Sequence, residues 1–239
     1  MSASGPRFRA VFLDLGGTLL DERDYPAWVE IGAALGLDVD EYHLAHAYLE
    51  VERETDTPRP PPHEERWREV LTRASGARVD LATARRFYDE LRAHPSPPRL
   101  YSDVRRSLVQ LREDGRRLGI ISNSRSESSV RELLQATDLI AFFEVVVSSG
   151  SEGVEKPDPE IFRRAAGKLD LPVASCFHVG DLAYRDAKAA QAAGFGSVWL
   201  NREGTGFGED PPEITSLTEL PFHLLSLEGR LDGPRPGGA

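Results

Sequence analysis

The stretch AVFLDLGGTL, residues 10–19, decides the fold of this chain. Its apolar half ends at Asp14, and two glycines, Gly16 and Gly17, follow after one leucine. We interpret residues 8–14 as a first buried strand, because a short apolar run bounded by glycines is typical of a strand inside a parallel sheet. In an open α/β sheet, ligands bind just beyond the carboxyl ends of the strands. The stretch therefore predicts that Asp14 lies at a binding site.

A second stretch, CFHVGDLAYRD at residues 176–186, has the same design. Its apolar run reaches Gly180 and is followed by Asp181 and, five residues later, by Asp186. Magnesium prefers hard oxygen ligands and keeps several of its waters. We expect Asp181 to bind such a cation directly and Asp186, about a helical turn away, to hold a cation-bound water. Helix capping by either aspartate is the alternative.

The rest of the chain alternates strand patterns with helix patterns. We predict strands over residues 8–14, 117–122, 144–148, 176–180 and 196–200, and helices over residues 103–114, 126–136, 159–169 and 184–193. This alternation predicts an α/β fold, in which a Rossmann-like parallel sheet is joined by right-handed crossovers.

Residues 20–98 interrupt this alternation. They show four helical patterns and no convincing strand, around residues 26–35, 41–54, 64–75 and 81–93. We therefore predict three parts: an α/β core domain at residues 1–19 and 99–228, an inserted all-helical cap domain at residues 20–98, and a disordered tail at residues 229–239, which is rich in glycine and proline.

Composition limits the classes of partner. The chain has 239 residues and a formal net charge of -10, so we expect no nucleic-acid partner, because phosphate-backbone binding normally needs a basic face. The single cysteine, Cys176, excludes an internal disulfide and a cysteine-based metal site. We expect no membrane partner, no signal peptide and a cytoplasmic location, because no apolar run approaches the ~18 residues of a membrane span. Monomer and homodimer both stay open.

Two further polar positions lie between the aspartate stretches. Ser122 and Asn123 end a predicted strand before a helix, where a hydroxyl and backbone N–H groups can bind an anion. Lys156, just before a proline, could neutralise Asp14 and phosphate oxygens. Each feature also has an alternative interpretation without a functional role. Ser122 and Asn123 could cap a helix, Lys156 could be a solvated surface residue, and the segment after Asp14 could be a simple turn.

The four positions, taken in order, resemble the motifs of the haloacid dehalogenase-like hydrolase superfamily. The family's first motif, D-x-D-G-T-L, is similar to D-L-G-G-T-L at Asp14–Leu19. Its second is an apolar strand ending in Ser or Thr, as at Ser122, and its third is Lys before Pro, as at Lys156. Its fourth, G-D-x-x-x-x-D, is found at Gly180–Asp186. The resemblance covers nearly the whole chain and is weakest in the cap.

The resemblance implies a role for each matched residue. Asp14 would be the nucleophile, and magnesium would be the cofactor. The implied catalytic residues are Asp14, Ser122 and Lys156; the phosphate-binding residues are Leu15, Gly16, Ser122, Asn123 and Lys156; and the metal ligands are Asp14, Gly16 through its carbonyl, Asp181 and Asp186. Family caps that follow the first motif directly close over small soluble substrates, so the implied partner is a small phosphorylated compound.

The sequence departs from the family at Gly16. In most family phosphatases this position is an aspartate that protonates the leaving group and later activates water, help that typically contributes about 10²–10⁴ in rate. Glycine can do neither, so alkyl phosphates should be slowed most. Five other groups could replace the missing acid, although each is expected first as a solvated surface group: Asp21, Glu22, His43, His46 and His63.

The departure leaves alternative functions open. The family's 2-haloacid dehalogenases also lack the second aspartate, but they need no metal and lack the Gly-Asp pair that includes Asp181. Phosphonatases use a cap lysine, and residues 20–98 contain none. The function we expect is a magnesium-dependent phosphatase that hydrolyses a small phosphorylated metabolite through an aspartyl-phosphate. The alternatives are a binding or regulatory protein on the same fold and a 2-haloacid dehalogenase-type hydrolase.

Overall fold

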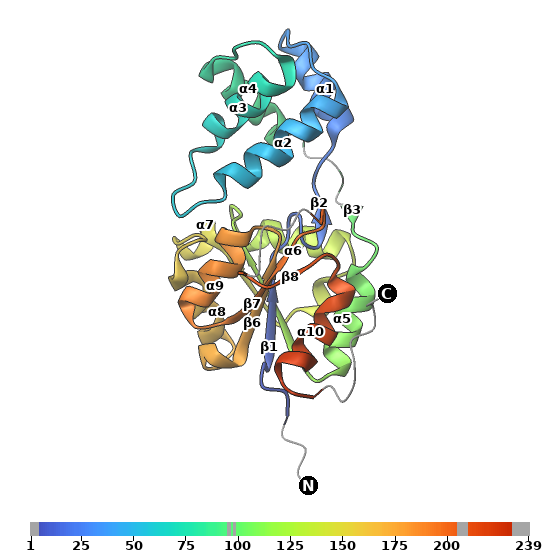
Figure 1. Ribbon diagram of the computed structural model, residues 1–239, viewed down its shortest axis with the longest axis vertical. Coiled ribbons are helices and arrows are strands. Elements are labelled where there is room, and N and C mark those ends of the chain that lie inside the picture. The colour runs from blue at the N-terminus through green and yellow to red at the C-terminus, as the bar shows by residue number, and fades with distance from the viewer. Residues whose placement is uncertain (1–4, 95–96, 98, 205–209, 231–239) are drawn as a thin grey trace. The chain divides into compact units, whose positions relative to one another are not determined.

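The computed structural model describes residues 5–94, 97, 99–204 and 210–230. The chain divides into two compact units, Met1–Asp21 with Arg99–Ala239 as the first and Glu22–Pro98 as the second (Figure 1). Most of the tail predicted at residues 229–239 lies outside the described residues. No helix among the described residues combines the length and the apolar character that crossing a bilayer requires.

The first unit is built on a six-stranded sheet with the order β5-β4-β1-β6-β7-β8. All neighbouring strands run parallel, which confirms the predicted α/β, Rossmann-like fold. The strands are β1 (Ala10–Leu13), β4 (Arg117–Ser122), β5 (Val145–Ser148), β6 (Cys176–Gly180), β7 (Gly196–Leu200) and β8 (Glu213–Ile214). The short edge strand β8 was not predicted, because two residues give no periodic signal.

Helices cover both faces of this sheet (Figure 1). In β1, Val11 and Leu13 belong to one apolar cluster, whereas Ala10 and Phe12 belong to another, because successive side chains of a strand point to opposite faces. The first cluster includes residues of α5 (Val104–Glu113), α6 (Glu127–Ala136) and α10 (Leu220–Leu227), and the second includes residues of α8 (Pro159–Lys168) and α9 (Ala189–Ala193). Complete burial of β1 and β6 on both faces explains why their sequences are continuous apolar runs.

Three further features of the first unit differ from the sequence predictions. Leu20–Asp21 (β2) pairs antiparallel with Arg99–Leu100 (β3), so the prediction of no strand in residues 20–98 is wrong. The helix predicted at residues 184–193 begins instead as a π-helical segment, Ala183–Lys188, and becomes α-helical only in α9. The short helices were also not predicted: α7 (Ser149–Glu152), α10 and 3₁₀ turns at Ile140–Phe142, Val173–Ser175 and Leu217–Glu219.

The described residues of the second unit form four helices, close to the four predicted patterns. They are α1 (Tyr25–Ala34), α2 (Glu41–Thr55), α3 (His63–Ser75) and α4 (Leu81–Ala93). Their shared core contains Trp28 and Trp67, whose rings meet edge to face at 5.1 Å. Asp24, Asp40 and Asp80 cap α1, α2 and α4 by accepting hydrogen bonds from the first turn of each helix.

Candidate active site

Asp14 follows the last residue of the central strand β1 and is 8% exposed. Its backbone N–H donates to the carbonyl of Val179 in β6, at 3.0 Å, so the chain is still aligned with the sheet at this residue. Ser122 ends β4 on one side of β1, and Asp181 follows β6 on the other. Because parallel strands end at the same edge of a sheet, these side chains come from neighbouring positions at the carboxyl edge.

Lys156 is buried and joins two of the carboxylates. Its Nζ donates to Asp14 Oδ1 at 2.6 Å and to Asp186 Oδ1 at 2.5 Å. Asn123 holds the lysine backbone through a reciprocal pair of 2.9 Å hydrogen bonds, one to the Lys156 carbonyl and one from the Lys156 N–H. Burial lowers the pKa of Lys156, but the charges of Asp14 and Asp186 outweigh burial and raise it overall. Lys156 is therefore a fixed cation. The alternative interpretation, in which Lys156 is a solvated surface residue, is wrong.

Asp186 is fixed by three donors. Besides Lys156, His178 Nε2 lies 3.2 Å from Asp186 Oδ1, and the Leu182 N–H donates to Oδ2 at 3.1 Å. Burial raises the pKa of Asp186, but the Lys156 charge and the His178 hydrogen bond outweigh burial and lower it overall. The aspartate fits against Gly180 so closely that a Cβ there would lie 2.2 Å from Asp186 Cγ. Asp186 thus stays ionised and holds the lysine in place.

Asp181 completes a cluster of carboxylates. One oxygen each from Asp14, Asp181 and Asp186 lies within 4.8 Å of the others. Burial raises the pKa of Asp181 well above its usual range, and the charges of Asp14 and Asp186 add to this; burial likewise raises the pKa of Asp14. Three carboxylates face one lysine, so full ionisation leaves two negative charges uncompensated. An all-oxygen donor set with this excess charge fits a hard divalent cation such as Mg²⁺.

The remaining predicted residues lie in the loops around this cluster. Leu15 is buried, and its carbonyl accepts from the backbone N–H groups of Leu19 and Leu20, which closes the turn. Gly16 forms an isolated bridge with Leu20. Ser122 is buried at 6% exposure, whereas Asn123 is exposed although its amide bonds the Lys156 backbone.

Four of the five candidate replacement acids have a described contact within their own unit. Asp21 forms an ion pair with Arg99 at 3.6 Å. His43 and His46 are largely exposed and pair with acidic residues of their own segment, Asp40 and Glu50. His63 stacks on a tyrosine ring of the second unit, with ring centroids 5.1 Å apart. Glu22 opens the second unit.

Sequence reasoning missed several residues that shape the site. It gave no functional role to His178, whose Nε2 contacts Asp186 while its Nδ1 has no hydrogen-bond partner among the described residues. It also gave no role to Trp199, whose indole N–H donates to the Asp181 carbonyl at 2.8 Å, or to Arg202, which bonds the loop after Asp14. No local motif predicts these contacts, whose partners lie 8, 18 and 185 residues apart in sequence.

The sequence matches a family profile described as haloacid dehalogenase-like hydrolase over residues 8–194. The match covers most of the chain and contains all four motifs. This chain belongs to the haloacid dehalogenase-like hydrolases. The family membership predicted from the motifs is thereby confirmed, and the protein is a hydrolase of this family.

Several relatives of this haloacid dehalogenase-like hydrolase are phosphatases. The chain is 33% identical over 152 residues to a phosphoserine phosphatase of Thermus thermophilus, covering 62% of this chain and 57% of the relative. It is 32% identical over 176 residues to a glyceraldehyde 3-phosphate phosphatase of Methanopyrus kandleri, covering 72% of each. It is 31% identical over 134 residues to the human N-acylneuraminate-9-phosphatase, covering 54% of this chain and 53% of the relative. The chain thus spans little more than half the length of two of these relatives.

Solved structures of the family share the fold. The HAD-hydrolase YfnB of Bacillus subtilis, solved with magnesium bound, superposes with a TM-score of 0.70 at 20% identity, covering 91% of this chain and 99% of that one. A 2-haloacid dehalogenase of Pseudomonas syringae gives a TM-score of 0.56 at 22% identity, covering 92% and 99%. A hydrolase solved with magnesium and a 2-haloacid dehalogenase thus share this architecture, so the fold does not select the reaction.

Proposed function

We propose that this hydrolase is a magnesium-dependent phosphatase that acts on a small phosphorylated compound through an aspartyl-phosphate on Asp14. The observation that carries the proposal is the arrangement of Asp14, which is buried, hydrogen-bonded to the Lys156 ammonium and part of a cluster of three carboxylates. A carboxylate can attack a phosphoryl group when nearby positive charge lowers the repulsion between the two anions. The phosphatase names of the relatives support the same choice.

Asp14 and Asp181 are the side chains that would hold Mg²⁺, with the Gly16 carbonyl as a further ligand. The ion would bind phosphate oxygens and stabilise the charge on the transferring group. Asp186 would act mainly by fixing Lys156, because both of its carboxylate oxygens already accept hydrogen bonds from protein donors.

The chain's own residues account for two chemical steps. One oxygen of Asp14 attacks phosphorus, the phosphate ester P–O bond breaks, and the alcohol oxygen leaves with a proton taken from water. Water then attacks the same phosphorus, the Asp14–phosphate bond breaks, and free Asp14 is restored. Inorganic phosphate is released, and of the two protons of the attacking water one stays on phosphate and one neutralises the hydroxide left by the first step. Lys156 offsets negative charge in both steps. Gly16 supplies no proton, so the leaving group decides how fast the first step proceeds.

The experiment is a phosphate-release assay with p-nitrophenyl phosphate, phosphoserine, glyceraldehyde 3-phosphate and N-acylneuraminate 9-phosphate. It is run with Mg²⁺, with EDTA, and with the Asp14→Asn variant. The matched control is Asp138→Asn, because the Asp138 side chain is 90% exposed. We expect release that needs Mg²⁺, disappears in Asp14→Asn and persists in Asp138→Asn.

Two other outcomes would replace the proposal. Halide release from 2-haloacids that survives EDTA would assign the protein to carbon–halogen chemistry. Binding of phosphorylated compounds without turnover of any of them would make it a binding protein on a hydrolase fold.

A further inference from the structure

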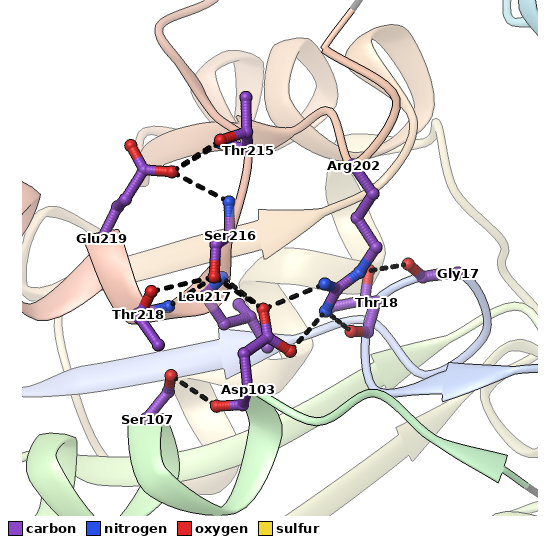
Figure 2. A network of polar contacts seen from close by, with 10 residues as sticks. All are labelled: Gly17, Thr18, Asp103, Ser107, Arg202, Thr215, Ser216, Leu217, Thr218 and Glu219. Atoms are coloured by element: carbon purple, nitrogen blue, oxygen red, sulfur yellow. Dashed lines mark hydrogen bonds and ion pairs between the residues drawn. The ribbon is translucent and has the colours of Figure 1, made fainter.

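Arg202 lies two residues after β7, and its side chain contacts two other parts of the first unit, the loop after Asp14 and Asp103 (Figure 2). Its Nε donates to the Gly17 carbonyl at 3.2 Å, and its Nη2 donates to the Thr18 carbonyl at 2.7 Å. The same guanidinium forms a two-pronged ion pair with Asp103, at 2.9 and 3.1 Å, and lies 3.8 Å from the centroid of the Tyr101 ring. The Arg202 side chain is only 14% exposed, so these contacts are largely shielded from water.

Asp103 is itself held in place. Its Oδ2 accepts from the Ser216 hydroxyl and from the Leu217 N–H, both at 2.9 Å (Figure 2). Burial raises the pKa of Asp103, but the hydrogen bonds from Arg202 and Leu217 outweigh burial and lower it overall. The carboxylate is therefore charged at neutral pH and provides a fixed anchor for the guanidinium.

The contacts of Arg202 lead directly to the carboxylate cluster. Gly17 has φ +68° and lies so close to Asp181 that a Cβ at this position would be 2.1 Å from Asp181 Oδ2. The position of the Gly17 peptide therefore limits where the Asp181 carboxylate can lie. On the other side, Trp199 of β7 donates to the Asp181 carbonyl. The end of β7 thus fixes both the loop after Asp14 and the residue that follows β6.

We propose that Arg202 is a positioning residue for the cation site, which it sets by holding the Gly17–Thr18 segment against Asp181. The inference rests on the proposed function, because it assigns Arg202 a role in Mg²⁺ binding. A lysine cannot replace Arg202. The planar guanidinium donates to the two backbone carbonyls and to the Asp103 carboxylate at once, and a single ammonium group cannot reach all of these acceptors. Partners one shell away from metal ligands typically change metal affinity or activity by about 10–100-fold when removed.

Arg116 offers a matched control within the same unit. It too donates to a carbonyl next to β1, that of Phe8, at 2.8 Å, and it forms a two-pronged ion pair with Glu228 at 2.8 and 3.1 Å. Its side chain is fully buried, so its replacement should destabilise the fold at least as much. Arg116, however, lies at the start of β4, the opposite end from the carboxylate cluster.

The test compares full-length wild type, Arg202→Lys and Arg116→Lys by calorimetric titration of metal-free protein with MgCl₂. Thermal unfolding is measured alongside, with steady-state kinetics at a temperature where all three are folded. We expect Arg202→Lys to bind Mg²⁺ about 10–100-fold more weakly and to lose kcat, whereas Arg116→Lys loses thermal stability and keeps wild-type Mg²⁺ affinity. If Arg202→Lys does not fold, Asp103→Asn removes the anchor charge and should weaken Mg²⁺ binding in the same direction.

Each other outcome would overturn the inference. Wild-type Mg²⁺ affinity in folded Arg202→Lys or Asp103→Asn would remove the positioning role and leave the proposed function intact. Equal loss of Mg²⁺ affinity in the Arg202 and Arg116 variants would assign both residues to general stability. Absence of Mg²⁺ binding by wild type would remove the metal from the proposed function, and this inference with it.

Discussion

Gly16 and Gly17 follow Asp14 by two and three positions, and a side chain would act differently at each. At Gly16, which forms a bridge with Leu20, the family usually carries the acid–base carboxylate that this chain lacks. At Gly17, a side chain would meet Asp181 and would need a left-handed backbone that only glycine adopts freely. The first position therefore concerns the proton supply, and the second concerns the geometry of the cation site.

The substitution Gly16→Asp should raise the turnover of alkyl phosphates, by up to about a hundredfold, because it restores a group that can protonate the leaving oxygen. Turnover of p-nitrophenyl phosphate should change little, since its leaving group needs less protonation. Steady-state kinetics on both substrates measures the difference, and Gly16→Asn, which has the same shape without an acid, serves as the control. No gain on alkyl phosphates would mean that another group already supplies the proton.

The substitution Gly17→Ala should weaken Mg²⁺ binding and destabilise the fold by about 1–3 kcal/mol, because it adds both backbone strain and a collision with Asp181. Gly115→Ala isolates the strain, since Gly115 has φ +78° with no atom within 4 Å of an added Cβ. Calorimetric Mg²⁺ titration and denaturant unfolding of both variants separate the two effects. Equal Mg²⁺ affinity in the two variants would show that Gly17 does not shape the cation site.

The sequence predicts which residues meet at the site better than it predicts what holds them. Asp14 and Asp181 come directly after strands at the carboxyl edge, where strand ends can be found from apolar runs and glycines. Lys156 and Asp186 lie farther along the segments that follow β5 and β6 at the same edge. The contacts of Arg202 depend on side-chain directions across nearly two hundred residues of sequence, for which no periodicity gives a signal.

Helices and strands were predictable from the sequence where the pattern of their own apolar residues determines where they begin and end. Strands β4, β6 and β7 begin and end where the apolar runs do, because burial on both faces of a parallel sheet leaves a continuous pattern. The π-helical segment Ala183–Lys188 was not predictable, because its sequence is equally suited to an α-helix. It places Asp186 against Lys156 and His178, and π-helical turns are frequent at functional sites.

The C-terminal helix α10 is tied to the start of the sheet by a pH-dependent contact. Burial raises the pKa of Glu228, but hydrogen bonds from Arg116 and from the Phe8 N–H outweigh burial and lower it overall. The depressed pKa means that this stabilisation is present above the unfolded-state pKa of about 4.3 and is lost as pH falls through the lower folded-state pKa.

Glu228→Gln should therefore destabilise the protein at pH 7 by about 2 kcal/mol, less than the 3–5 kcal/mol of a fully broken buried pair because the amide keeps some hydrogen bonds. The difference from wild type should shrink steadily as pH falls below the unfolded-state pKa of about 4.3, as measured by urea unfolding over a series of pH values. Glu144→Gln, which breaks the half-exposed pair with Arg117, should cost under about 1 kcal/mol. A pH-independent loss in Glu228→Gln would contradict the assigned charge.

At the scale of the whole molecule, the chain leaves and re-enters the first unit at one point. Strand β2 ends at Asp21 and β3 begins at Arg99, and these two residues are direct partners in the antiparallel ladder. A two-residue turn can join such partners as a hairpin. The second unit, Glu22–Pro98, therefore interrupts the first in sequence and leaves the β2–β3 pairing in place.

Replacing residues 22–98 by Asn-Gly should give a chain that folds as the first unit alone. We expect a cooperative thermal transition, a circular dichroism spectrum of an α/β protein and retained Mg²⁺ binding, because the carboxylate cluster and Lys156 all belong to this unit. Selectivity among phosphorylated substrates should fall, because the family resemblance implies that the inserted unit is a cap that closes over small substrates. An unfolded or aggregated product would show that the first unit depends on the second for stability.

The most direct test of the central claim is to identify the residue that carries the phosphoryl group during turnover. Wild-type protein is mixed with Mg²⁺ and a good substrate from the release assay, quenched in acid, which preserves acyl phosphates, and digested for mass spectrometry. The account predicts one phosphoryl group on Asp14, absent from Asp14→Asn and removed by hydroxylamine. A phosphoryl group on another side chain, or unchanged turnover by Asp14→Asn, would contradict it.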